Sequence, residues 1–256
     1  MKFVIRNIKV PLRTVISPSL LLLTIFGLFY GISSSLSLSS FRQYLLEEEP
    51  WITIFIWYIS LFILSFLLIS ILSKKSYQTY GFRKPEKWMP KFLFIATLLL
   101  IFGNIVPLAI RLYMGENIPK ESIFICHNDS ALSRIFNIIL ISLFIPLTEE
   151  TTFRGLFQTY LMRRTEGYID IAKWRIHTGT IITIIFYVLF HLINIFPPVS
   201  LEWESLLRLL IFVIVLGTIL SYLYQETKSL YPSMLFHSII NTSLYISGYI
   251  IVTFFY

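Results

Sequence analysis

The chain has 256 residues, of which 56% are hydrophobic and only 14% are charged. This composition is typical of polytopic membrane proteins and excludes an ordinary soluble domain. The net charge of +7 does not require nucleic acid, because the basic residues cluster in short loops beside apolar segments, where membrane orientation explains them. The single cysteine, Cys126, excludes an intrachain disulfide and a CxxC metal site.

Seven apolar segments are each close to the ~20 residues that a helix needs to cross the bilayer. They cover residues 15–38, 51–73, 89–112, 134–162, 177–196, 204–225 and 230–255. The last segment either crosses once or breaks near Ser247 and Gly248 to give an eighth segment. We therefore expect an all-α, polytopic bundle of seven to eight helices that spans the lipid bilayer.

Most Lys and Arg residues lie before the first apolar segment and after the second, fourth and sixth. Because cytoplasmic loops are enriched in Lys and Arg, this pattern places the N-terminus in the cytoplasm. The first segment is long and has no convincing small-residue cleavage site, so we expect a retained helix rather than a signal peptide. The short chain without a soluble appendage fits an integral protein of a bacterial plasma membrane.

Two adjacent acids, Glu149 and Glu150, interrupt the fourth apolar segment. A carboxylate in hydrocarbon is costly, so an intramembrane acid is by default a functional residue with a partner. Arg154 follows Glu150 by four residues and therefore lies on the same helical face, within reach of its carboxylate. Glu149 is rotated by about 100° from Glu150. One acid thus has a structural partner, while the other remains available for chemistry.

Two of the four histidines also lie inside apolar segments. His191 is in the fifth, and His237 is in the last, where Asn241 follows one turn later on the same face. Each has an ordinary structural explanation when taken alone, because a histidine can bind a backbone carbonyl and Asn often joins membrane helices. Their occurrence together with Glu149 in one half of the chain favours a common site.

Three chemistries suit this set of residues. Glu149 and His191 could deprotonate a water while His237 and Asn241 stabilise an oxyanion. The same glutamate and both histidines could instead bind Zn²⁺ with an open position for water. A chain of acids and histidines also suits the proton relay of a proton-coupled transporter. The residues alone leave these alternatives open.

The order of the motifs resembles the CPBP family of intramembrane proteases. Each motif lies in its own segment: Glu149-Glu150-x-x-x-Arg154, an aromatic residue four positions before His191, and His237-x-x-x-Asn241. This family, also called Abi, includes the type II CAAX prenyl endopeptidases and bacterial proteins linked to bacteriocin processing and self-immunity. The resemblance covers about residues 134–245. Tyr187 departs from the pattern, since the family usually has Phe at this position.

The resemblance implies an endopeptidase that acts on a peptide or a membrane-anchored protein, with no nucleic-acid partner. It assigns catalytic roles to Glu149, His191, His237 and Asn241. It assigns site-shaping roles to Glu150, Arg154 and Tyr187. A divalent cation such as Zn²⁺, if the enzyme uses one, would bind Glu149, His191 and His237.

Residues 134–256 then form the protease core, and residues 1–133 supply N-terminal helices for packing or substrate access. The alternatives are a non-catalytic self-immunity or partner-binding membrane protein of the same fold and, with less support, a proton-coupled transporter.

The expected depths of these residues differ. At 1.5 Å per residue, Glu149 lies near the middle of its segment, His191 closer to the outer end, and His237 closer to the cytoplasmic end. A common site therefore requires staggered or tilted helices, or segment boundaries that differ by several residues.

Overall fold

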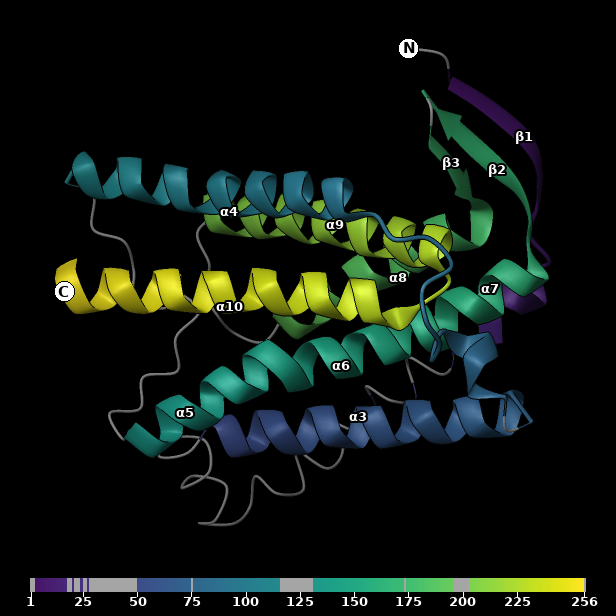
Figure 1. Cartoon of the computed structure of the whole chain (residues 1–256), viewed down its shortest axis with the longest axis horizontal. Coiled ribbons are helices and arrows are strands. Elements are labelled where there is room, and N and C mark those ends of the chain that lie inside the picture. Colours follow the sequence, from purple (N-terminus) through teal and green to yellow (C-terminus); the bar gives the residue numbers. More distant parts are fainter. Residues whose placement is uncertain are drawn as a thin grey trace.

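The computed structural model describes residues 3–17, 20, 24, 27, 50–74, 76–115, 131–172, 174–195 and 203–255. In this part of the chain, long helices lie side by side and a small sheet covers one end of the bundle (Figure 1). Most of the first expected segment, residues 15–38, lies outside the described residues, as does the loop that contains Cys126.

Five long helices account for most of the bundle. They are α3 (Pro50–Leu72), α4 (Pro90–Tyr113), α8 (Thr178–Ile195), α9 (Trp203–Thr227) and α10 (Leu230–Phe255). Both α3 and α4 begin at a proline, whose fixed φ and missing N–H suit the first turn of a helix. A short 3₁₀ turn, η1 (Tyr77–Tyr80), lies between these two helices.

One continuous helical run precedes the sheet strands β2 and β3 and contains both glutamates of the candidate site. Its parts are α5 (Ala131–Ile139), η3 (Leu140–Phe144), α6 (Ile145–Glu149), η4 (Glu150–Gln158) and α7 (Thr159–Arg164), of which η3 and η4 are π-helical. Short π-helical stretches are rare and occur frequently at functional sites. Here they lie on either side of Glu149.

Four helical stretches are long and apolar enough to cross a membrane, judged by length and composition. They are Ile54–Leu72, Pro90–Pro107, Ser133–Arg164 and Leu206–Thr227, and a shorter apolar helix covers Thr178–Leu192. The last helix, α10, continues through Ser247 and Gly248, so the break considered there is not present. The prediction of an all-α helical membrane protein is confirmed, and the four stretches coincide with four of the seven expected segments.

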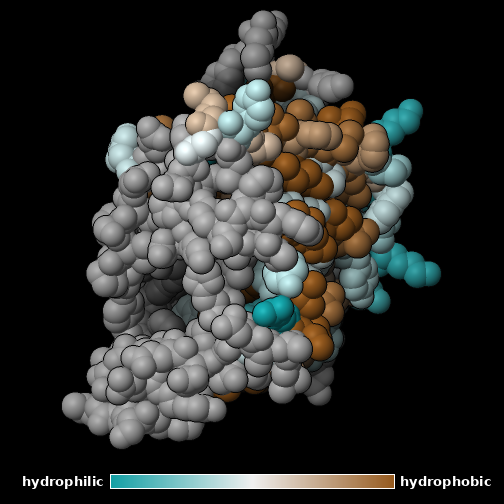
Figure 2. Space-filling model, turned by 90° about the vertical axis from the view of Figure 1, so that its left-hand side faces the viewer, coloured by the Kyte–Doolittle hydropathy of each residue, from teal (hydrophilic) through white to brown (hydrophobic). Residues whose placement is uncertain are grey.

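The outward-facing side chains of the bundle are largely apolar. Among the exposed ones are Ile63, Leu67 and Ile71 on α3 and Phe94, Leu99 and Phe102 on α4. Figure 2 looks onto the end opposite the sheet, and the described side chains on its visible flank are mostly hydrophobic. Extended apolar surface of this kind is typical of contact with lipid rather than with water.

A three-stranded antiparallel sheet in the order β1-β2-β3 was not predicted from the sequence. Its strands are β1 (Phe3–Lys9), β2 (Glu166–Ile171) and β3 (Trp174–His177). Phe3 pairs with Ile171 at one end of the sheet, and Tyr168 pairs with His177 at the other. The sequence did not indicate this sheet because β1 is separated from its partner by several helices along the chain.

The helix α3 packs alongside the run that carries the glutamates (Figure 1). The hydroxyls of Ser65 and Thr152 form a hydrogen bond at 2.8 Å, and one turn later Ile69 packs against Leu156. The two helices are close at Gly155, where a Cβ would lie 3.4 Å from Cδ1 of Ile69. The contacts advance in the same direction along both helices, which fixes their register.

The start of α10 is anchored by the loop that precedes α4. The backbone N–H of Leu230 donates to the carbonyl of Gly81 at 2.9 Å, and the N–H of Glu86 donates to the carbonyl of Thr227 at 2.9 Å. Gly81 has φ = 89°, a conformation that glycine adopts without strain. As a result, α10 begins nearer the middle of the bundle than α7 ends (Figure 1).

The helix α8 is capped by a histidine outside the spanning helices. Nδ1 of His177 accepts a hydrogen bond from the N–H of Gly179 at 3.0 Å, and the N–H of His177 donates to Oε1 of Gln225 at 2.8 Å. Burial, assisted by the charge of Lys228, lowers the pKa of the His177 imidazole below its ordinary value. Protonated Nδ1 cannot accept the Gly179 hydrogen bond, so the cap requires the neutral ring.

This cap makes stability depend on pH. Because the folded pKa of His177 lies below the unfolded value of about 6.5, its contribution is complete above that pH and is lost as the pH falls toward the folded pKa. We expect the wild-type unfolding temperature to drop between about pH 7.5 and about pH 5, and His177→Gln to show a smaller drop. Identical pH dependence of the two proteins in thermal unfolding would contradict this prediction.

Candidate active site

The carboxylate of Glu149 lies at the meeting point of three helices. Its side chain is buried at the end of α6, with the residue 2% exposed. Oε1 accepts a hydrogen bond from the hydroxyl of Tyr58 on α3 at 3.0 Å. Oε2 lies 3.8 Å from Nε2 of His191 on α8 and 3.9 Å from Nε2 of His237 on α10. Within the described residues, Oε2 has no hydrogen-bond partner.

The ring of His191 is oriented by its own helix. Its Nδ1 lies 2.9 Å from the carbonyl oxygen of Tyr187, one turn earlier. A carbonyl only accepts hydrogen bonds, so Nδ1 carries the proton and donates it. In the neutral ring, Nε2 is therefore an acceptor, and it is this atom that lies near Glu149.

His237 connects the two adjacent acids. Its Nδ1 lies 2.9 Å from Oε1 of Glu150, while its Nε2 is the atom near Glu149. The same Glu150 oxygen accepts a hydrogen bond from Nη1 of Arg154 at 3.1 Å, and both side chains of this ion pair are fully buried. The predicted i,i+4 pairing is therefore present. Because this carboxylate oxygen accepts from Arg154, we take Nδ1 of His237 as a second donor to it.

The guanidinium of Arg154 is enclosed on its other sides. Nη2 donates to the carbonyl of Gly217 on α9 at 3.4 Å, and the guanidinium carbon lies 4.4 Å from the centre of the Tyr187 ring. A Cβ at position 217 would lie only 2.7 Å from Cδ1 of Tyr187, so this close approach requires glycine. The arginine is thus held by an acid, a backbone carbonyl and an aromatic face.

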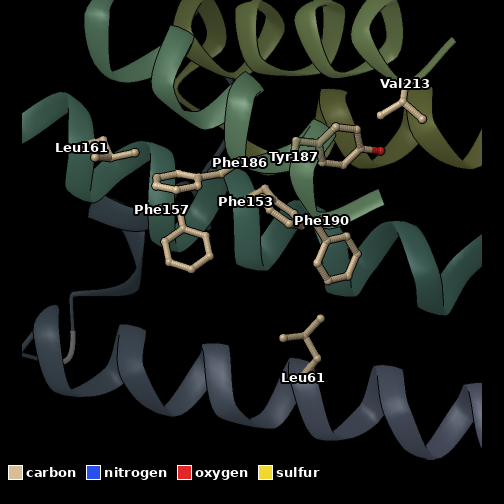
Figure 3. Packing of buried hydrophobic residues seen from close by; sticks show 8 residues of the cluster. All are labelled: Leu61, Phe153, Phe157, Leu161, Phe186, Tyr187, Phe190 and Val213. Carbon is tan, nitrogen blue, oxygen red and sulfur yellow. The ribbon is translucent and has the colours of Figure 1, made fainter. Parts of the chain in front are cut away.

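Tyr187 belongs to a buried hydrophobic cluster in which aromatic rings predominate (Figure 3). Its ring makes an edge contact with Phe153 at 5.1 Å between centroids, and Phe153 makes a similar contact with Phe190. Figure 3 shows the Tyr187 hydroxyl pointing away from Phe186. The hydroxyl is buried and has no hydrogen-bond partner among the described residues. The ring therefore carries the packing role that Phe has in the family pattern.

Asn241 is linked to the helical run rather than to the carboxylate. Its Nδ2 donates to the carbonyl of Ile141 at 3.3 Å, and the neighbouring Thr242 donates to the hydroxyl of Ser142 at 2.8 Å. Both acceptors lie in the π-helical segment η3. Among the hydrogen bonds of the described residues, none joins Asn241 to Glu149, although Asn241 lies one turn beyond His237 on α10.

Glu149, His191 and His237 lie close together, although their positions along the expected segments placed them at different depths in the membrane. Because α10 begins nearer the middle of the bundle than α7 ends (Figure 1), His237 reaches the level of Glu149 although it lies early in its helix. His191 reaches the same level from the opposite part of α8, which begins directly after β3. Staggered helices thus bring both histidines within 4 Å of one carboxylate oxygen.

The tautomers of the two histidines match those of metal ligands, which commonly donate the other ring N–H to a carbonyl or carboxylate. The separations of 3.8 and 3.9 Å exceed the roughly 3.3 Å expected between neighbouring ligands of a tetrahedral zinc ion. In the part of the chain that the structure describes, no group of three or more His, Cys, Asp or Glu side chains is arranged as a metal site. The zinc site stays a prediction.

Tyr58 is the site residue that the sequence motifs did not indicate. It lies in the N-terminal half of the chain, in one of several apolar segments that contain aromatic residues, and the chain has 15 tyrosines in total. The available signal was the seven-residue spacing between Tyr58 and Ser65, which places two polar groups on one face of an otherwise apolar helix. That spacing indicates a packed face, but not a carboxylate opposite it.

Comparison with known families finds a match in the part of the chain that carries the site. Residues 131–243 match the family described as type II CAAX prenyl endopeptidase Rce1-like. Neither the comparison with curated proteins nor the comparison with solved structures finds a match. The matched residues include both glutamates, both membrane histidines and Asn241. This part of the chain is thus similar to the Rce1-like type II CAAX prenyl endopeptidases.

Proposed function

We propose that this protein is an intramembrane endopeptidase that hydrolyses a peptide bond of a peptide or membrane-associated protein through a water activated by Glu149. One observation carries the proposal: Nε2 atoms from two different helices lie within 4 Å of the same buried oxygen of Glu149. With His191 in its neutral form, its Nε2 and Oε2 of Glu149 are both acceptors. Such a group suits a water molecule, which can donate two hydrogen bonds.

Glu149 is the base in this proposal. Its Oε2 takes a proton from the water, and the resulting hydroxide attacks the carbonyl carbon of the scissile bond. The carbonyl oxygen becomes a tetrahedral oxyanion. Breakage of the C–N bond then requires a proton on the leaving nitrogen, which Glu149 returns with His191 as its partner. One water is consumed, and an acid and an amine are formed.

His237 is the proposed donor to the oxyanion. In its protonated form Nε2–H donates, and the Glu150 carboxylate at 2.9 Å from Nδ1 stabilises the positive ring. A carboxylate that orients and stabilises an imidazolium has the same role in serine protease triads. Asn241 supplies a second donor, because only one of its two N–H groups is directed to Ile141.

The basic loops support an N-terminus in the cytoplasm, and we propose a bacterial plasma membrane as the location. The connections from α3 to α4 and from α9 to α10 and the strands of the sheet all lie at one end of the bundle (Figure 1). These connections contain most of the basic residues outside the helices. A common basic end is the arrangement that the positive-inside rule describes.

Removal of the base should abolish cleavage. We expect Glu149→Gln and His191→Ala to lower the rate of peptide cleavage by at least about 100-fold, because each loses a group that moves a proton. The measurement uses purified protein and a quenched peptide library, with the folded state of each variant checked by thermal unfolding. Glu166→Gln is a matched control, since this acid is exposed and its carboxylate pairs with Lys9 in the sheet. Undiminished cleavage in either site variant would refute the assignment.

A chelator series tests the metal in the same assay. Activity that is lost with chelator, restored by added zinc and absent in Glu149→Gln identifies a metalloprotease. Activity that is indifferent to chelator but absent in Glu149→Gln identifies water activated by the glutamate alone. If Glu149→Gln keeps the biological effect of the wild type, the protein acts by binding a partner and not by hydrolysis.

Arg154 is expected to act through stability. Arg154→Met leaves Glu150 as an uncompensated buried charge, and removing one partner of a buried pair costs about 3–5 kcal/mol. We expect the double variant Glu150→Gln, Arg154→Met to regain most of this loss, because the buried charge is gone and the substituted amide oxygen can still accept from His237. Thermal unfolding of the three proteins in detergent provides the comparison. A single variant as stable as the wild type would contradict the structural role.

The orientation can be tested with the single native cysteine. A membrane-impermeant maleimide added to intact cells should modify Cys126, which belongs to the predicted outer loop. In the variant Cys126→Ser, Ser76→Cys, the new thiol replaces an exposed serine at the opposite end and should react only after lysis. The reverse pattern would invert the proposed topology.

A further inference from the structure

The hydroxyl of Tyr58 contacts the carboxylate from outside the residues that match the family. Tyr58 lies on α3, and residues 131–243 are the matched part of the chain. Its hydroxyl donates to Oε1 of Glu149 at 3.0 Å. The histidines lie near the other oxygen, Oε2. Each oxygen of this carboxylate therefore has a distinct environment, and that of Oε1 is supplied by the N-terminal half.

The register between the two helices holds Tyr58 at this position. The hydroxyl of Thr148, the residue before Glu149, donates to the backbone carbonyl of Tyr58 at 3.3 Å. Farther along both helices, the hydroxyls of Ser65 and Thr152 form a second polar link at 2.8 Å, and both groups are buried. Sliding of α3 along the run would break both links together. The contact with Glu149 is thus part of a fixed helix interface.

A donor on one oxygen determines the rotation of a carboxylate. Without it, rotation about the last side-chain bond can turn the carboxylate plane so that neither oxygen faces the histidines. With the Tyr58 hydroxyl bound to Oε1, the carboxylate plane is fixed and Oε2 remains directed at His191 and His237. Hydrogen bonds to an ionised group are stronger than those between neutral groups, so this orientation persists.

We propose that Tyr58 is a positioning residue, whose hydroxyl holds Oε1 of Glu149 so that Oε2 faces the two histidines. The inference rests on the proposed function, because it concerns the same carboxylate. It gives the N-terminal helices a direct part in the active site. Tyr58 does not itself exchange a proton with the substrate, since its hydroxyl proton is already donated to Glu149.

The test compares Tyr58 with a second tyrosine whose hydroxyl also forms a hydrogen bond at α3. Tyr58→Phe removes the hydroxyl and keeps the ring. Tyr77→Phe is the matched control, because the Tyr77 hydroxyl pairs with Ser70 of α3 at 3.2 Å, away from the carboxylate. We expect Tyr58→Phe to lower kcat by about 10- to 100-fold, the loss that one hydrogen bond to an ionised group produces. KM should stay unchanged, and Tyr77→Phe should behave as the wild type.

A spectroscopic readout separates positioning from packing. The infrared difference between wild type and Glu149→Gln isolates the carboxyl bands of Glu149, whose frequencies depend on hydrogen bonds to their oxygens. These bands should shift in Tyr58→Phe and stay in place in Tyr77→Phe. A purely structural role of Tyr58 would change the unfolding temperature without moving these bands.

The outcomes distinguish this inference from the proposed function. A loss of kcat at constant KM together with shifted bands supports it. Wild-type kcat in Tyr58→Phe overturns it, and so does a raised KM with unchanged kcat, because the hydroxyl would then contact substrate. If the wild type cleaves no peptide, the proposed function fails, and the bands alone decide: a shift supports the positioning of Glu149 by Tyr58, and unmoved bands overturn it.

Discussion

The burial of two adjacent carboxylates in an apolar bundle is the constraint on which the site depends. Glu149 and Glu150 are 2% and 0% exposed, and an acid at such a position is costly unless it is paired or hydrogen-bonded. Their partners come from different helices. Arg154 comes from the same helical run, and His237 comes from α10. With Tyr58 of α3 and His191 of α8, these contacts hold the helices together around two residues.

The π-helical segments on either side of Glu149 add hydrogen bonds between helices close to the two buried acids. A π-helical stretch widens the turn and releases backbone carbonyls from the regular pattern. At the end of η4, the hydroxyl of Thr159 donates to the carbonyl of Arg154, five residues earlier. In η3, the carbonyl of Ile141 accepts from Asn241 of α10. Side chains thus satisfy backbone groups here, and the run is joined to α10 near the site.

The sequence predicted the parts of the site that local geometry determines. The i,i+4 rule found the Glu150–Arg154 pair, and the motif order found that Glu149, His191 and His237 lie together. These signals are short-range or belong to one family pattern. The assigned roles of Asn241 and the histidines in catalysis stay predictions, since no observation tests them.

The features that the sequence did not predict depend on contacts between distant segments. Tyr58 resembles the other aromatic residues of apolar helices until the register of α3 is known. The bond between His237 and Glu150 depends on where α10 begins, which is set by its anchor at Gly81. The sheet depends on pairing of β1 with a strand beyond several helices. Composition and periodicity describe single segments, so they do not contain these relationships.

The two acids differ in the kind of partner that the fold gives them. Glu150 has a permanent cation, Arg154, which holds its negative charge in place. Glu149 instead contacts a tyrosine hydroxyl and lies near two histidine rings, which are neutral or conditionally charged. A rotation of about 100° between successive residues therefore directs two adjacent acids toward different partners.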